Sequence, residues 1–186
     1  ARPFVQTTWA QEIGQDGRPV LLPANQIGPQ GTITCPDVAG GTNWMSPSFN
    51  PSTGLFYVTS REVCAKYYAF PQKFLEGHVY WGGAVETIPG EPGYGALRAI
   101  DPVTGLVRWE FKYPKPSFGG TLSTASGLVF AGEADGNLMA FDATTVDEMF
   151  VLGEVTGDLD GLGADGIAVS AEHAAEQGWT IGTQVP

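Results

Sequence analysis

Short apolar runs separated by polar turn residues recur through the second half of the chain. Four such runs lie at residues 122–125, 128–131, 138–141 and 150–152. Ser126-Gly127 and Asp135-Gly136 stand between them, and pairs of this kind are typical of tight hairpin turns. The pattern predicts short antiparallel strands. No apolar run approaches the roughly 18 to 20 residues that a membrane-spanning helix needs.

A sequence repeat organises these predicted strands. Ala99–Trp109 and Ala140–Phe150 both fit the pattern A-x-D-x-x-T-x-x-x-x-aromatic and begin 41 residues apart. A second pair of matching segments lies upstream of each copy: Gly40-Gly41-Thr42 before residues 54–58, and Gly119-Gly120-Thr121 before residues 127–131. A period of about 40 residues is typical of four-stranded β-propeller blades.

The repeat predicts an all-β fold that forms part of a β-propeller, with about two four-stranded blades. We expect a lead-in segment and strand, a first blade with a long inserted loop, a second blade, and an irregular acidic C-terminal tail. The corresponding ranges are 1–39, 40–113 with the insertion at 61–94, 114–153 and 154–186. The insertion is rich in aromatic residues, so we expect it to cover a site, to dock onto a neighbour or to pack on itself.

The repeat element around Asp101 has a physical rationale as a blade docking motif. Asp101 can accept hydrogen bonds from its own turn, Thr104 lies within that turn, and Gly105 can adopt the left-handed conformation that closes it. Ala99 leaves space on one face of the sheet, whereas Trp109 offers a large flat ring. This combination predicts that one blade stacks on the next.

The charge balance excludes several classes of partner. Nine Lys and Arg stand against 20 Asp and Glu, which gives a net charge of −11, and 26 Gly and 14 Pro point to a turn-rich globular chain. Such a charge repels phosphate backbones and anionic membranes, so a nucleic-acid role is not expected. The last 40 residues contain eight of the acids and no Lys or Arg, which marks a boundary near Val146.

The two cysteines leave two alternatives open. Cys35 and Cys64 fit no paired zinc or redox signature, so a metal site is not expected there. They are either two free buried thiols or a disulfide that closes a loop of about 30 residues. Such a disulfide would stabilise the fold by on the order of 3 kcal/mol and would require an oxidising compartment.

Several segments resemble one known family. Ala99–Trp109 is similar to the tryptophan docking motif of the pyrroloquinoline quinone (PQQ)-dependent alcohol dehydrogenases, which are periplasmic quinoproteins built on an eight-bladed propeller. Gly40–Trp44, Ser48–Val58 and Phe118–Ala125 resemble stretches of the C-terminal part of that propeller, and Pro3–Trp9 resembles the segment before them. The resemblance covers roughly residues 3 to 145.

The resemblance implies a cofactor site at three residues. In this family an Asn-Trp pair lies at the quinone, which assigns cofactor binding to Asn43 and Trp44. Phe118 stands where the family usually has Trp, and there it contributes mainly through its backbone. A carboxylated quinone needs amide and N–H donors held on rigid strands, which agrees with this assignment. The alternatives are that Asn43 satisfies a buried turn and that Trp44 packs between blades.

The resemblance further implies a fragment of an enzyme. The family oxidises alcohols by transfer of hydride equivalents to PQQ, with calcium or another metal ion whose ligands, like the catalytic base, lie outside this chain. We therefore expect no catalytic residue and no metal ligand here, and an inactive chain in isolation. The implied partners are the alcohol, an electron acceptor such as a cytochrome c, and the missing N-terminal blades. The implied location is periplasmic or secreted, which favours a Cys35–Cys64 disulfide.

Two rival classes remain. A non-enzymatic propeller scaffold of the periplasm shares the docking motif, but Asn43-Trp44, the aromatic insertion and the cysteine pair favour the enzyme. A secreted calcium-dependent binding module would instead depend on the acidic, glycine-rich loop Asp158–Gly166. That loop is present in a single copy, which makes it a weak calcium motif.

Overall fold

The computed structural model describes residues 2–146, 148–152, 175, 178 and 180. Its secondary-structure elements are all strands apart from one turn of 3₁₀ helix, η1 (Pro23–Asn25). The strands are β1 (Ala10–Ile13), β2 (Pro19–Leu21), β3 (Thr32–Thr34), β4 (Ser48–Asn50), β5 (Leu55–Glu62), β6 (Ala65–Ala69), β7 (Gly83–Thr87), β8 (Tyr94–Ile100), β9 (Val107–Tyr113), β10 (Thr121–Ser123), β11 (Leu128–Gly132), β12 (Leu138–Asp142) and β13 (Glu148–Leu152). This agrees with the predicted fold class.

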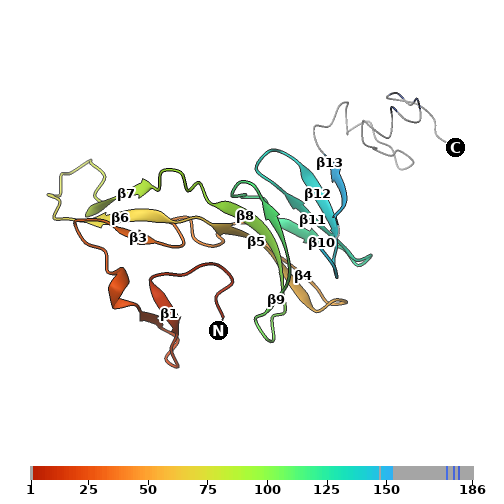
Figure 1. The fold of residues 1–186 in the computed structure, drawn as a ribbon, viewed down its shortest axis with the longest axis horizontal. Helices are drawn as coiled ribbons and strands as arrows, with labels where there is room; N and C mark the ends of the chain where they lie inside the picture. The colour runs from red at the N-terminus through yellow and green to blue at the C-terminus, as the bar shows by residue number, and fades with distance from the viewer. Residues whose placement is uncertain (1, 147, 153–174, 176–177, 179, 181–186) are drawn as a thin grey trace.

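Two four-stranded antiparallel sheets form the centre of the molecule. Their strand orders are β4-β5-β8-β9 and β10-β11-β12-β13. Every strand pairs with its neighbour in sequence or across the insertion, as hairpin connections require. The three larger sheets follow one another along the long axis of the view in Figure 1, with β10–β13 at the C-terminal end.

The pairing register of the first sheet explains its packing. Tyr57 on β5 lies opposite Ala99 on β8, and Ala99 lies opposite Trp109 on β9. Because Ala99 has a small side chain, the rings of Tyr57 and Trp109 approach to a centroid distance of 5.8 Å above it. All three residues are buried. The predicted space beside Ala99 is therefore filled by two aromatic rings.

The main hydrophobic core lies between the two four-stranded sheets. Side chains from both sheets form one cluster, and its members include Leu97, Trp109, Val129 and Phe141. The ring centroids of Trp109 and Phe141 are 6.4 Å apart, so the aromatic residue of the first repeat packs on the facing strand of the second sheet. This is the stacking of one repeat on the next that the docking motif predicts.

The segment expected as an inserted loop contains two short strands. β6 and β7 lie within residues 61–94, and they pair with β3 in a separate three-stranded sheet of order β3-β6-β7. Burial along β6 falls from buried Ala65, through three half-buried residues, to exposed Ala69, as in a strand at the surface. The connection between β6 and β7 carries exposed Phe74, whose ring packs edge-on against Tyr80 at 6.1 Å.

The predicted tail, residues 154–186, lies almost entirely outside the described residues, as does the acidic loop Asp158–Gly166. The predicted division of the chain into a lead-in segment, two blades and a tail stays a prediction. Across the part of the chain that the structure describes, no helix is long and apolar enough to cross a membrane.

Candidate functional site

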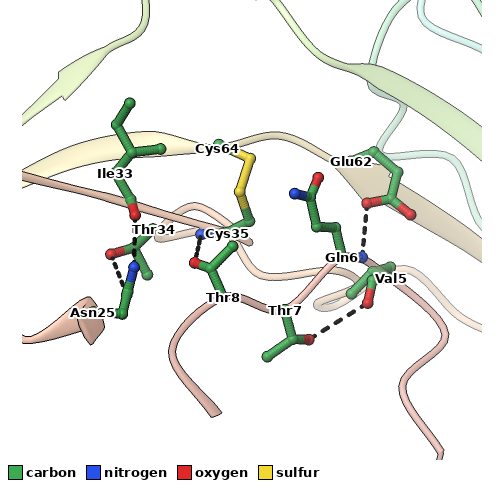
Figure 2. The surroundings of a disulfide bond; sticks show 10 residues. All are labelled: Val5, Gln6, Thr7, Thr8, Asn25, Ile33, Thr34, Cys35, Glu62 and Cys64. Carbon is green, nitrogen blue, oxygen red and sulfur yellow. Dashed lines mark hydrogen bonds between the residues drawn. A yellow bond between two sulfur atoms is a disulfide. The ribbon is translucent and has the colours of Figure 1, made fainter. Parts of the chain in front are cut away.

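A disulfide anchors the segment that carries two of the predicted site residues. Cys35 and Cys64 are bonded, with a Cα–Cα distance of 4.4 Å (Figure 2). The adjacent backbone adds a hydrogen bond from the Asp37 N–H to the Val63 carbonyl at 2.7 Å. On the other side, the Cys35 N–H donates to the Thr8 hydroxyl at 2.9 Å. Of the two alternatives for the cysteines, the disulfide is the one that the structure shows.

Arg61 forms a second attachment between β5 and the same segment. Its backbone N–H donates to the Gly41 carbonyl at 2.8 Å, and its Nη2 lies 3.1 Å from the Asp37 carboxylate. The residue is only 6% exposed, so the ion pair is shielded from solvent. Residues 35–44 are thus held along β5 by a covalent bond, backbone hydrogen bonds and a buried ion pair.

Trp44 and Phe118 form a parallel stacked pair. Their ring centroids are 5.1 Å apart and the angle between the ring planes is 4°. The two residues lie far apart in the sequence, and the Thr121 N–H, which donates to the Ser46 carbonyl at 2.8 Å, joins the segments that carry them. Trp44 is 70% exposed and Phe118 is 46% exposed. The pair therefore presents a flat aromatic surface, carried by the segments that precede β4 and β10.

Asn43 lies beside this pair in the chain and caps the preceding turn. Its Nδ2 donates to the Ala39 carbonyl at 3.1 Å, and the residue is exposed. The alternative that Asn43 satisfies a buried turn is therefore met only in part. The amide nitrogen does bind the turn, but the side chain is exposed. Trp44, in contrast, is not packed between the sheets, because most of its surface is accessible.

The second glycine pair lets the backbone approach closely around Phe118. A Cβ on Gly119 would collide with the carbonyl oxygen of Gly132, and one on Gly120 would lie 3.3 Å from the Ser46 carbonyl oxygen. The Ser117 hydroxyl also fixes this loop, because it donates to the Gly132 carbonyl at 2.8 Å and accepts from the Gly119 N–H at 3.0 Å. Glycine is therefore required at position 119 for steric reasons, whereas position 120 leaves little room for a Cβ.

Sequence analysis missed Arg61 as a site residue. The guanidinium carbon lies 4.2 Å from the centroid of the Phe118 ring. Two buried polar atoms near this point, Nε of Arg61 and Oγ1 of Thr42, have no hydrogen-bond partner. The available signal was a cationic residue at the end of a strand that begins with an apolar run, three residues before Cys64.

The Asp turn of the docking motif forms in both copies. In the first, Asp101 accepts hydrogen bonds from the N–H groups of Val103 and Thr104, at 2.9 and 3.1 Å. In the second, Asp142 accepts from the N–H groups at positions 144 and 145, at 2.8 and 3.0 Å. The pKa of each carboxyl lies below its ordinary value of 3.8. The largest cause is a backbone hydrogen bond, from the N–H at position 104 to Asp101 and from the N–H at position 145 to Asp142.

The remaining predicted motif residues also lie as expected. Gly105 has a φ of +71°, and its N–H donates to the Asp101 carbonyl at 2.7 Å. Trp109 reaches the second sheet, where its Nε1 donates to the Ala143 carbonyl at 3.3 Å. Thr104 contributes its hydroxyl, which accepts from the Leu106 N–H at 3.3 Å. Asp101, Thr104 and Gly105 thus close their own turn, whereas Trp109 joins the two sheets.

A buried cation on β8 is paired with two carboxylates of the first sheet. Arg98 contacts Glu62 at 2.7 Å and Glu110 at 2.6 Å. Burial lowers the pKa of this guanidinium, but hydrogen bonds to the two carboxylates outweigh that effect and raise it. Arg98 therefore stays charged, and each of its carboxylate partners is compensated. Among the residues that the structure describes, no group of three or more His, Cys, Asp or Glu side chains could hold a metal ion.

Comparison with known proteins gives consistent matches. The chain is 37% identical over 176 residues to the quinoprotein alcohol dehydrogenase PedH of Pseudomonas putida, covering 86% of this chain and 30% of that protein. It is 31% identical over 189 residues to the 1-butanol dehydrogenase (cytochrome c) of Thauera butanivorans, covering 91% of this chain and 27% of that protein. Models of protein families give no match.

A solved structure also matches most of this chain. A europium-containing methanol dehydrogenase aligns with a TM-score of 0.73 and 32% identity, covering 84% of this chain and 28% of that protein. The fold is thus all-β and of the propeller type found in these dehydrogenases. Over most of its length the chain is homologous to the PQQ-dependent quinoprotein alcohol dehydrogenases. It spans less than a third of the length of the relatives it matches.

Proposed function

We propose that this chain is the C-terminal part of the propeller of a PQQ-dependent alcohol dehydrogenase, and that Asn43, Trp44 and Phe118 form one wall of its quinone site. The observation that carries the proposal is the parallel Trp44–Phe118 pair, which leaves a flat aromatic surface exposed. A planar quinone stacks favourably on such a surface. When bound, the quinone supplies the acceptor for the hydride equivalent of the alcohol.

The donor set beside the aromatic pair fits the cofactor. PQQ carries carboxylates and carbonyls, which are acceptors for N–H and O–H donors. Nε of Arg61 and Oγ1 of Thr42 are buried polar atoms without a partner, and unsatisfied groups of this kind are unusual in a folded protein. Asn43 can exchange its bond to the Ala39 carbonyl for a polar edge of the ligand. The residues present therefore fit a carboxylated planar ligand.

The role of this chain in the reaction is to bind and orient the cofactor. Trp44 and Phe118 would hold the ring plane, and Asn43 would set its rotation within that plane. We assign the calcium or other metal ligands, the catalytic base and the remaining blades to polypeptide beyond this sequence. The alcohol and an electron acceptor, such as the cytochrome c named for the Thauera relative, are the expected partners.

A periplasmic or secreted location follows from the same proposal. The Cys35–Cys64 disulfide supports it, because structural disulfides persist in oxidising compartments. The relatives above are all dehydrogenases, which favours the enzyme over a non-enzymatic propeller scaffold.

The direct test is a titration of the purified protein with PQQ, followed by calorimetry and by quenching of tryptophan emission. Asn43→Ala is expected to weaken binding about tenfold to a hundredfold, because a hydrogen bond to a charged group is lost. His78→Ala is the matched control, since His78 lies in the exposed β6–β7 connection. Unchanged affinity in a folded Asn43→Ala variant would reduce the Asn43-Trp44 match to a packing feature.

A further inference from the structure

Arg61 is an unusual residue for its position. It lies near the end of β5, in a run of otherwise uncharged buried residues, and only 6% of its surface is exposed. A buried cation is costly unless it is paired and has a structural or functional use. The ion pair with Asp37 accounts for its charge, but not for its position over an aromatic ring.

The guanidinium, the phenyl ring and the indole form one continuous contact. The guanidinium carbon of Arg61 lies 4.2 Å from the ring centroid of Phe118. The same ring stacks on Trp44, with centroids 5.1 Å apart and planes 4° apart. A planar guanidinium suits such a contact better than an ammonium group, because it can lie flat on a ring. The orientation of Phe118 thus depends on a residue of the neighbouring sheet.

The Asp37 carboxylate holds the guanidinium, and backbone hydrogen bonds hold both Asp37 and Arg61 in place. The Asp37 carboxylate pairs with Nη2, and the Asp37 N–H donates to the carbonyl of Val63, the residue before Cys64. The Arg61 N–H donates to the Gly41 carbonyl. The cation therefore belongs to the region braced by the Cys35–Cys64 disulfide, whereas Phe118 belongs to the loop before β10.

We propose that Arg61 is a positioning residue, which holds the Phe118 ring, and through it the Trp44 indole, in the plane that the cofactor stacks against. The pair with Asp37 keeps the guanidinium centred on the ring. The use of this device for a quinone rests on the proposed function above. The positioning itself concerns only residues of this chain, so it can be tested without any ligand.

The test uses the full 186-residue chain labelled with 5-fluorotryptophan and observed by ¹⁹F NMR. The Trp44 line is assigned by its loss in Trp44→Phe. Arg61→Met, which keeps a chain of similar length without charge, is expected to shift and broaden the Trp44 line and to increase its quenching by acrylamide. Asp37→Asn is expected to change the line in the same direction, and Arg61→Lys to restore part of the wild-type position.

The matched control is Lys112→Met. Lys112 is an exposed cation that lies over the ring of Tyr94 at 4.9 Å, away from the site. This variant should leave the Trp44 line unchanged. The lines of Trp9, Trp81 and Trp109 report whether each variant keeps its fold. If Arg61→Met does not fold, the milder Asp37→Asn variant tests the proposal instead. A Trp44 line identical to wild type in the folded variants would overturn the proposal.

A second measurement separates this inference from the proposed function. PQQ is titrated into each variant, and Arg61→Met is expected to bind it about threefold to tenfold more weakly than wild type, the range set by loss of a cation–π contact. A shifted Trp44 line with no PQQ binding in any variant would leave the positioning role standing and refute the quinone site. PQQ binding that is equal in wild type and Arg61→Met, with an unmoved Trp44 line, would refute the positioning role alone.

Discussion

The indole N–H of Trp109 donates a hydrogen bond to the carbonyl oxygen of Ala143 on the facing sheet, at 3.3 Å. Trp109 is the last residue of the first repeat element, and Ala143 directly follows Asp142 in the second copy. The Tyr57 hydroxyl donates to the same carbonyl at 2.8 Å. Two large aromatic residues of one sheet thus donate to a single backbone carbonyl of the next repeat. Directional hydrogen bonds therefore join the repeats in addition to the buried apolar contacts.

Replacing Trp109 should therefore cost stability in two separable steps. We expect Trp109→Phe, which keeps a ring but loses the donor, to lower the free energy of unfolding by about 1 to 2 kcal/mol. Trp109→Ala should cost about 3 to 5 kcal/mol because it also leaves a cavity in the core. Urea unfolding measures both, and exposed Trp81→Phe is the control that should change little. Equal stability of Trp109→Phe and wild type would contradict the proposed role of the N–H.

The two donors to Ala143 should be coupled. Tyr57→Phe alone is expected to cost about 1 kcal/mol, since Trp109 still satisfies the carbonyl. The double variant Tyr57→Phe, Trp109→Phe leaves a buried acceptor without these partners, so its loss should exceed the sum of the single losses. A double-mutant cycle from urea unfolding gives the coupling, and additive losses would show that the two hydrogen bonds act independently.

Reduction of the Cys35–Cys64 disulfide should destabilise the chain and loosen the site. The bond closes a loop with a sequence separation of 29 residues, for which chain entropy predicts about 3 to 4 kcal/mol. Intact mass before and after alkylation shows whether the bond is present in protein from an oxidising compartment. Urea unfolding of the Cys35→Ser, Cys64→Ser variant measures the effect, and two freely alkylated thiols in unreduced protein would contradict the structure.

The docking turns predict a loss of stability in acid. Asp101 and Asp142 both have a lowered pKa in the folded chain, so each carboxylate binds a proton less readily folded than unfolded. Their contribution is present above the ordinary value of 3.8 and is lost as pH falls through the lower folded values. The free energy of unfolding is measured at pH values from about 5 down to about 3. It should fall less steeply with decreasing pH in the double variant Asp101→Asn, Asp142→Asn than in wild type. An unaltered slope would assign the acid sensitivity to other groups.

The outer face of the second sheet should cause self-association. Leu122 is 62% exposed and Leu138 is 41% exposed, and they line a hollow of about 390 Å³ together with Phe130. Exposed apolar patches of this kind favour association. Light scattering of the purified chain should show oligomers, which Leu122→Lys should reduce. A monodisperse wild-type monomer would contradict this prediction.

The chain by itself should not oxidise alcohols. The proposed function places the metal ligands and the catalytic base outside this sequence, so dye-linked assays with added PQQ and calcium should show no turnover. The positive control is a full-length relative, assayed with the metal ion that it requires. Robust turnover by the purified 186-residue chain would refute the assignment of the chemistry to other polypeptide.

The sequence was sufficient for the features that depend on neighbouring residues. The strands around Ser126-Gly127, the turn from Asp101 to Gly105 and the spacing of the two repeat elements could be read directly, because each is fixed by turn chemistry or by alternation along a strand. The stacking of Trp109 on the next repeat followed from its periodicity. The segment from Asn43 to Trp44 was found through family resemblance and not through its local pattern.

Only the tertiary structure decided the features that depend on distant segments. It paired β6 and β7 with β3 where a loop was expected, because aromatic residues of mixed spacing suit either an irregular loop or a half-exposed strand. It joined Cys35 to Cys64, a pairing that their spacing left open. It also placed Arg61 over Phe118 and Phe118 on Trp44. Contacts of this kind are set by how whole sheets pack, and no local pattern of residues determines that packing.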